Sequence, residues 1–268
     1  MAPAPRVGHA GRVKIATYNV NGINGRLAGL LAWLADARPD VVCLQELKAP
    51  TDRFPEAALV QAGYGAVWHG QSRWNGVAIL ARGSDPVLTR RGLPGDPDPA
   101  QSRYIEAAVG GILVASLYLP NGNPLPGPKF DYKLAWFETF AVHAAGLFAS
   151  GLPVVLAGDY NVIPTDFDVA SPRSVAGNAL IQPESRAAFA RVLAQGWTDA
   201  LRTLNPDKPM FTFWDYFRNA FARDAGMRLD HLLLSAGLAA RLRAAGVDRA
   251  VRAAEGSSDH APAWIELD

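Results

Sequence analysis

The sequence predicts an α/β fold, a four-layer α/β sandwich in which two packed mixed β-sheets are flanked by helices. Short runs that are apolar throughout, such as 41–44 and 152–157, are typical of strands buried on both faces. They alternate with segments whose apolar residues recur at helical spacing, such as 27–34 and 130–148. This strand–helix–strand order favours sheets that are covered by helices.

The individual elements follow in chain order. Residues 13–18 alternate in polarity and predict a strand, and the leucines between 27 and 34 predict an amphipathic helix that ends near Pro39. The segment 121–130 holds Asn, Gly and three prolines and predicts a rigid surface loop. Further strands are predicted at 41–44, 64–68, 77–81, 104–109, 112–119, 152–157, 211–214, 227–235, 247–253 and 264–267, and further helices at 130–148 and 184–194.

Length and composition indicate one domain with a large core. The chain has 268 residues, of which 49% are apolar, and this is enough for a single large α/β unit. We found no repeat, linker or low-complexity tract. We therefore expect one domain over 13–268, preceded by a disordered arm over 1–12.

Charge and cysteine content limit the expected partners and cellular compartment of the protein. With 26 basic and 25 acidic residues the net charge is +1, which argues against indiscriminate coating of nucleic acid. Cys43 is the only cysteine, so no internal disulfide forms, as in a reducing compartment. Neither a secretory leader nor a membrane-spanning stretch is evident. We expect a soluble, cytoplasmic protein that acts as a monomer, without a membrane partner.

Polar clusters follow several of the predicted strands. Each cluster holds carboxylates or amides, and the last also holds a histidine, at 18–22, 44–46, 158–161 and 258–262. There is no cysteine cluster and no group of histidines at ligand spacing. Oxygen donors of this kind suit a hard divalent ion and a phosphate better than zinc. The sequence therefore predicts one site built from strand ends.

Several of these residues also have a plainer explanation. Asn19 and Asn21 are more often turn residues than ligands when taken alone, and Glu46 is equally well a solvated charge at a strand end. Asp230 lies on the opposite face of its strand from His231 and would hold the imidazole of His260 in one tautomer. The aromatic run 211–214 is usually core, although it could also wall an apolar pocket.

These motifs, in this order, resemble the endonuclease/exonuclease/phosphatase superfamily, and within it the exonuclease III branch of abasic-site DNA repair enzymes. Gly-Asp-x-Asn at 158–161 and Ser-Asp-His-x-Pro at 258–262 are typical of the superfamily. The branch is marked by Leu-Gln-Glu-x-Lys at 44–48, by Tyr-x-Pro-Asn-Gly at 118–122 and by the block from 211 to 230. The resemblance covers nearly all of 13–268.

The resemblance implies a role for each motif residue. It implies that Glu46 is the metal carboxylate, with Asn21 and Asp259 as nearby or alternative ligands. It implies that Asp159 positions the attacking water and that His260, paired with Asp230, is the catalytic imidazole. It places the remaining residues on the substrate side: Tyr118, Asn19, Asn121 and Asn161 near the phosphate, and Phe213, Trp214, Met227 and Leu229 around an apolar pocket for a base-less sugar.

The function expected from this resemblance is a Mg²⁺-dependent (or Mn²⁺-dependent) endonuclease that cuts double-stranded DNA 5′ to abasic sites and leaves a 3′-hydroxyl. The family also implies 3′→5′ exonuclease activity and the cleaning of blocked 3′ ends. One alternative is a phosphatase or phosphodiesterase of the same superfamily that acts on a phosphate ester other than DNA. Another is a catalytically inactive DNA-binding protein. Whether Asp159 or His260 accepts the proton stays open from the sequence.

Overall fold

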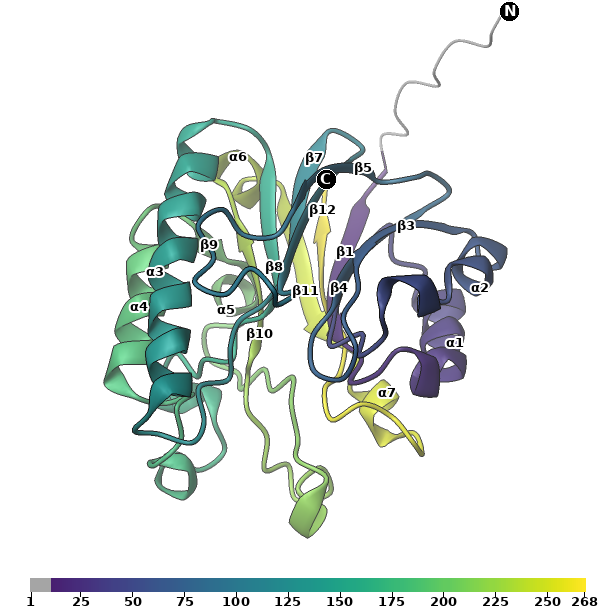
Figure 1. The fold of residues 1–268 in the computed structure, drawn as a ribbon. Helices are drawn as coiled ribbons and strands as arrows, with labels where there is room; N and C mark the ends of the chain where they lie inside the picture. The colour runs from purple at the N-terminus through teal and green to yellow at the C-terminus, as the bar shows by residue number, and fades with distance from the viewer. Residues whose placement is uncertain (1–10) are drawn as a thin grey trace, which may run out of the picture.

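A computed structural model describes residues 11–268, in which two six-stranded sheets pack face to face between layers of helices (Figure 1). The expected arm over 1–12 falls largely outside the described residues. Helices α1 and α2 cover one outer face, and α3 and α4 cover the other (Figure 1). The predicted four-layer α/β sandwich is therefore confirmed.

The first sheet has the strand order β11-β12-β1-β2-β4-β3, and the second has the order β5-β6-β7-β8-β10-β9. The strands of the first sheet are β1 (Val13–Asn19), β2 (Val41–Gln45), β3 (Tyr64–His69), β4 (Val77–Arg82), β11 (Leu242–Val247) and β12 (Ala263–Leu267). Those of the second are β5 (Val87–Arg91), β6 (Tyr104–Val109), β7 (Ile112–Tyr118), β8 (Val154–Asp159), β9 (Thr198–Asp199) and β10 (Asp230–Leu234).

The helices differ widely in length. The α-helices are α1 (Leu27–Ala37), α2 (Glu56–Gln61), α3 (Pro128–Ala149), α4 (Pro183–Leu193), α5 (Ala200–Leu204), α6 (Ala236–Ala239) and α7 (Arg249–Ala253). Short 3₁₀ helices lie at η1 (Asn24–Arg26), η2 (Thr51–Arg53), η3 (Asp166–Asp168), η4 (Pro172–Val175) and η5 (Phe217–Asn219). Within the described residues, no helix is both long and apolar enough to cross a membrane.

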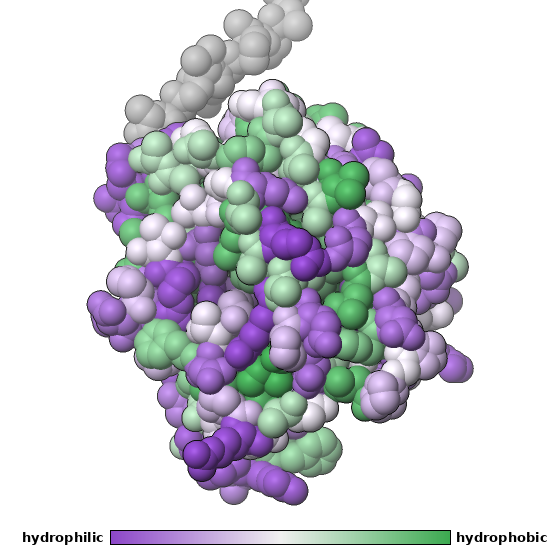
Figure 2. Space-filling model, turned by 90° about the vertical axis from the view of Figure 1, so that its left-hand side faces the viewer, coloured by the Kyte–Doolittle hydropathy of each residue, from purple (hydrophilic) through white to green (hydrophobic). Residues whose placement is uncertain are grey.

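Side-chain spacing explains the layers. One apolar cluster fills the space between the sheets, with Ile15, Cys43 and Leu232 among its members. A second lies between the first sheet and α1, and a third lies between the second sheet and the helices α3 and α4. Burying each large apolar side chain stabilises the fold by roughly 1.5–3 kcal/mol. The face formed by α3 and α4 mixes hydrophilic and hydrophobic residues (Figure 2).

Two predicted strands are wrong. The segment 211–214 makes only isolated bridges, from Phe213 to Met227 and to His260, because it crosses from one site segment to another without running alongside either. The segment 247–253 ends β11 and then forms α7, which a run of apolar and Arg residues also permits. The edge strand β5 and helix α2 were not predicted, since both are short and largely exposed.

Candidate active site

The candidate site lies where strands from both sheets end. β1 and β2 run parallel, as do β7 and β8, so their last residues share one edge. Asn19, at the end of β1, donates from Nδ2 to Glu46 Oε1 and to Asp159 Oδ2, at 2.9 Å in each case. Asn19 is fully buried and therefore links carboxylates that come from different sheets. Its expected contact with a phosphate stays a prediction.

Both carboxylate oxygens of Asp159 are held in place. Its Oδ1 accepts a hydrogen bond from the backbone N–H of Asn161 at 2.9 Å, and its Oδ2 lies 3.7 Å from Nε2 of His260. Burial raises the pKa of Asp159 above its usual range and outweighs the opposing effect of His260. A buried carboxylate with a raised pKa and a fixed orientation is a candidate general base.

His260 is fixed by Asp230. The ring donates from Nδ1 to Asp230 Oδ2 over 2.7 Å, and both side chains are buried. Burial alone would lower the pKa of His260, but the carboxylates of Asp230, Asp159 and Asp259 raise it to about 10. The imidazole is therefore charged near neutral pH, with its Nε2 directed toward Asp159. The neighbouring His231 points away and lies among Tyr160, Phe189 and Arg228.

Tyr118, Asn121 and Asn161 form one wall of the site. Tyr118 ends β7 beside Asp159, and burial together with the Glu46 and Asp159 carboxylates raises the pKa of its phenol well above the ordinary value. The phenol thus stays a hydrogen-bond donor. Asn121 donates from Nδ2 to Oδ1 of Asn161 at 2.9 Å, and Asn161 donates to the carbonyl of Leu119. The two loops that follow β7 and β8 are therefore held together.

Glu46, Asn21 and Asp259 gather on the other side of Asn19. Asn21 donates from Nδ2 to Asp259 Oδ1 at 3.0 Å. The ammonium of Lys48 lies 2.7 Å from Glu46 Oε2 and also donates to Oδ1 of Asn21. Burial alone would raise the pKa of Glu46, but Lys48 and the hydrogen bond from Asn19 lower it below the ordinary value. A cation is thus already held between two of the predicted metal ligands.

Two groups that share no residue could hold a metal ion. Asp159, Asp230 and His260 each offer one ligand atom, and these atoms lie within 4.8 Å of one another. Those atoms, however, already pair among themselves. Glu46, Asn21 and Asp259 offer hard oxygens, and the ammonium of Lys48 already places a cation between the oxygens of Glu46 and Asn21. This oxygen set therefore fits a hard divalent ion.

The expected apolar pocket is divided. Phe213, Met227 and Leu229 pack in one cluster with Leu180, whereas Trp214 packs in another with Phe221 and donates to Asp224. The physical reason is that neighbouring residues of an extended segment point to opposite sides. Trp214 therefore packs apart from the other three, and its expected place at the pocket stays a prediction. Leu229 is 3% exposed and Trp214 is fully buried, so neither offers an open wall.

Several residues that support the site were not singled out from the sequence. Lys133, fully buried on α3, donates to the carbonyls of Pro120 and Asn161, at 3.1 and 2.5 Å. Thr212 Oγ1 accepts from the N–H groups of Leu229 and Asp230. The sequence did hold a signal for Lys133. It lies at helical spacing from Trp136, Phe137 and Phe140, so it falls on the buried face of α3.

A buried ion cluster lies beneath the segment that carries Asp230. Arg228 pairs with Asp168 at 2.7 Å and with Asp199 at 2.6 Å, and Arg202 also reaches Asp168. Burial would raise the pKa of Asp168, but Arg228 and Arg202 lower it well below the ordinary range. Because Arg228 immediately precedes Leu229 and Asp230, the cluster fixes where β10 begins.

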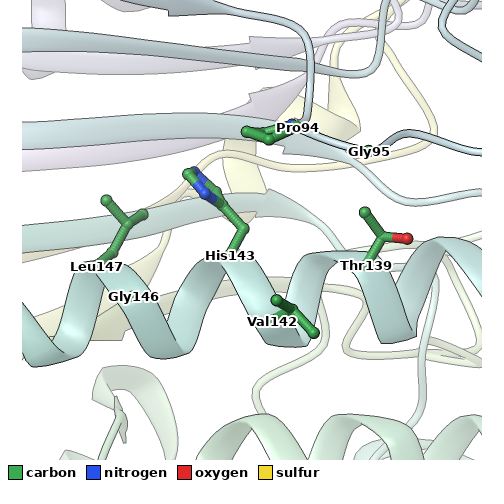
Figure 3. A pocket seen from close by; sticks show the side chains of 7 residues that line it. All are labelled: Pro94, Gly95, Thr139, Val142, His143, Gly146 and Leu147. Atoms are coloured by element: carbon green, nitrogen blue, oxygen red, sulfur yellow. The ribbon is translucent and has the colours of Figure 1, made fainter.

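A separate depression, which shares no residue with the candidate active site, lies on α3. It is lined by Pro94, Gly95 and residues of α3 from Thr139 to Leu147, among which only His143 is titratable (Figure 3). The His143 ring lies 2.5 Å from Glu106 Oε1 and is thus already engaged. This depression lacks the carboxylates of the candidate active site.

Comparisons with known proteins agree with this geometry. The profile of the Endonuclease/Exonuclease/phosphatase family matches residues 16–260. The chain is 33% identical to exodeoxyribonuclease III of Haemophilus influenzae, over 95% of this chain and all of that protein.

Solved structures give the same result. A 3′ phosphatase, NExo, from Neisseria bound to a product DNA hairpin superposes with a TM-score of 0.91 at 40% identity, covering 96% of this chain and 99% of that one. An AP endonuclease from Archaeoglobus fulgidus has a TM-score of 0.91 at 35% identity, with the same coverage. The likeness thus spans both sheets and every segment of the candidate site.

Proposed function

The chain belongs to the endonuclease/exonuclease/phosphatase family, and we propose that it is a DNA repair nuclease that hydrolyses the phosphodiester bond 5′ to an abasic site. It would leave a 3′-hydroxyl, and it would also remove blocking groups from 3′ ends. The observation that carries this proposal is the placement of Asp159, held by Asn19 and Asn161 with the charged His260–Asp230 pair beside it.

The residues of this chain have distinct tasks in such a reaction. The oxygen of a water molecule bonds to phosphorus, the bond between phosphorus and the 3′ oxygen breaks, and that oxygen takes up a proton. Asp159, with its raised pKa, would orient the water and accept its proton. His260 carries a charge near neutral pH and would stabilise the negative transition state, with Tyr118 donating to a phosphate oxygen.

A divalent ion completes the proposed site. Glu46, Asn21 and Asp259 would hold it, and we propose Mg²⁺, with Mn²⁺ as a substitute, because all three offer oxygen ligands. When bound, the ion would neutralise charge on the non-bridging oxygens and support the departing oxygen. Lys48 would then move away from Glu46 and Asn21.

We propose double-stranded DNA as the partner and a monomer as the acting form. A cytoplasmic location stays a prediction from the cysteine content.

A second candidate function is 3′-end processing without incision at internal abasic sites. It is favoured by the packing of the apolar group, in which Leu229 and Leu180 are buried against each other and Trp214 is turned away. An internal abasic sugar would need an open apolar pocket, whereas a 3′-terminal phosphate needs only the charged part of the site. The likeness to a 3′ phosphatase supports the same reading.

One experiment separates these candidates. Two end-labelled duplexes, one with an internal abasic analogue and one with a 3′-terminal phosphate, are incubated with Mg²⁺ or with chelator, using wild type and Asp159→Asn. Metal-dependent incision 5′ to the lesion supports the first candidate, and removal of only the terminal phosphate supports the second. Activity on neither, with turnover of a small phosphate ester, would replace DNA by another substrate. Binding without any cleavage would indicate an inactive DNA-binding protein.

A further inference from the structure

A cavity of about 520 Å³ adjoins the active site across Tyr118. It is shared by the loop 70–76, by Gln101 and Arg103 before β6, and by the segment from Tyr118 to Tyr132. In the second sheet, β8 lies between β7 and β10. The cavity therefore lies on the Tyr118 side of Asp159, opposite the apolar group beside β10. Its volume is within the roughly 300–1,000 Å³ typical of ligand sites.

The lining differs in charge from the rest of the active site. Among the described residues that line it, Arg103 and Lys129 are cationic and none is acidic. The Arg103 guanidinium lies over the Tyr118 ring, 4.9 Å from its centre, and Nη1 donates to the carbonyl of Tyr118. Amide side chains and the rings of Trp74, Tyr118 and Tyr132 make up most of the remainder. This chemistry favours an anionic ligand that also has a flat ring.

Trp74 provides a free aromatic surface. Its side chain is 72% exposed, although it is large and apolar. Single-stranded nucleic acid is commonly held by bases that stack on aromatic side chains next to cations. Trp74 lies beside the cations of the cavity, so its ring can act as such a surface.

Asn75 adds an unmet hydrogen-bond acceptor. Its Nδ2 donates to Gln71 Oε1 at 2.9 Å, and this oxygen also accepts from the backbone N–H of Ser102. The amide orientation of Asn75 is thereby fixed, since a flip would place two oxygens together. Its Oδ1 is buried and has no hydrogen-bond partner among the described residues. A base edge would supply the missing N–H donor once a small shift of the loop 70–76 opens this oxygen to the cavity.

We propose that this cavity is a subsite for one unpaired nucleotide, which neighbours the scissile phosphate on the side of Tyr118. The base stacks on Trp74 and donates to Asn75, and its phosphate lies near Arg103 and Lys129. A base that remained in a duplex would keep its edge in the pair and could not reach Asn75, which is 3% exposed. The identity of the ligand as DNA rests on the proposed function.

The test compares two trinucleotides that have the same phosphates, one with 2-aminopurine at its centre and one with a base-less sugar there. Affinity is measured with chelator present, so that binding does not depend on cleavage. We expect wild type to prefer the base-bearing trinucleotide and to quench its fluorescence. Trp74→Ala should lose about 5- to 150-fold in affinity for it, whereas Trp74→Tyr should retain most of the affinity.

Two controls make the outcome decisive. Val142→Ala alters an equally exposed position on α3 and should bind as wild type. The subsite proposal would be overturned if wild type and Trp74→Ala bound the base-bearing trinucleotide with equal affinity. It would also be overturned if Trp74→Ala lost as much affinity for the base-less trinucleotide as for the base-bearing one. Cleavage of duplex DNA is scored separately. If duplex DNA is cleaved but Trp74→Ala binds the trinucleotide as wild type does, only the subsite proposal fails. If Trp74→Ala loses affinity but no DNA is cleaved, only the proposed nuclease function fails.

Discussion

Nδ1 of His260 lies 2.7 Å from Oδ2 of Asp230, and this contact joins the segment before β12 to the start of β10. Asp230 begins a strand of the second sheet and His260 lies just before a strand of the first, so the imidazole is positioned only after both sheets have packed. Oδ1 of Asp230 has no hydrogen-bond partner among the described residues. The charge of Asp230 is therefore balanced mainly by His260, which explains why the pKa of this imidazole is raised.

Replacing Asp230 by Asn should uncouple this pair. Without the carboxylate, the pKa of His260 should fall from about 10 toward or below its ordinary value, because burial then dominates. We expect activity at neutral pH to fall by about 10²–10³-fold, because the transition state loses a positive charge. NMR titration of the ring in metal-free protein measures the pKa, and Asp207→Asn, at an exposed position outside the site, is the control. An unchanged ring titration would contradict the assignment.

Lys133 should make stability depend on pH. Burial lowers the pKa of Lys133 from 10.5 to about 7, so between these values the unfolded chain binds one proton more than the folded chain. The contribution of Lys133 to stability therefore increases with pH through this window, by roughly 1.4 kcal/mol per unit. His260 has the opposite effect, but it cancels in a comparison of wild type with Lys133→Met.

Urea unfolding at pH 7, 8 and 9 measures this difference. The stability of wild type relative to Lys133→Met should increase across the series. We also expect the variant to lose activity, because the carbonyls of Pro120 and Asn161 lose their common donor. Lys133→Arg keeps a donor and should recover part of that activity. A pH-independent difference in stability would mean that Lys133 does not titrate in this range.

Sequence and structure agree where a pattern is local and differ where packing decides. The strands before Glu46 and Asp159 were predictable because an apolar run buried on both faces has few alternatives, and the strand before Asn19 was predictable from its alternating polarity. The convergence of these strand ends was predictable only through the order of the motifs. The opposite orientations of Phe213 and Trp214 were not, because the segment that carries them is held by contacts with Met227 and Asp259 rather than by a sheet. Lys48 could be recognised from the sequence only as the last residue of the motif at 44–48, and its contacts with Glu46 and Asn21 could not be predicted.

The Arg228 cluster should control stability at low pH. Asp168 has a pKa lowered by Arg228 and Arg202, so its contribution to stability is present above about pH 4 and is lost as the pH falls toward the folded-state pKa. Arg228→Met should destabilise the protein by about 3–5 kcal/mol, because it leaves Asp168 and Asp199 without their buried partner. Urea unfolding at pH 7 tests this value.

A second variant, Asp168→Asn, tests the acid dependence of the cluster. It should flatten the loss of stability between pH 5 and 3, compared with wild type. An equally steep loss in the variant would assign the acid sensitivity to other carboxylates.

Gly158 should tolerate no side chain. A Cβ atom at this position would lie 2.0 Å from the carbonyl oxygen of Leu117, so β7 and β8 would have to separate directly before Asp159. We expect Gly158→Ala to lower both the thermal midpoint and the activity. Gly29→Ala is the matched control, because nothing lies within 4 Å of its Cβ and alanine favours the helix by roughly 0.5–1 kcal/mol. Normal activity in Gly158→Ala would show that the strand pair yields without moving Asp159.

Glu46 should distinguish the two candidate metal groups. If the ion binds at Glu46, Asn21 and Asp259, then Glu46→Gln should weaken direct Mn²⁺ binding by at least about tenfold, with Mg²⁺ competing for the same site. Spin resonance of free Mn²⁺ measures this without any turnover. Glu56→Gln, on the surface of α2, should bind as wild type.

An unchanged Mn²⁺ affinity in Glu46→Gln would instead favour Asp159, Asp230 and His260 as ligands. In that case the metal would have to displace the proton that His260 carries, because a ligating imidazole is neutral. Binding would then release a proton near neutral pH, which calorimetry in buffers of different ionisation enthalpy detects. With Glu46 as the ligand, little proton release is expected at neutral pH, because its pKa is lowered and its carboxylate is already ionised.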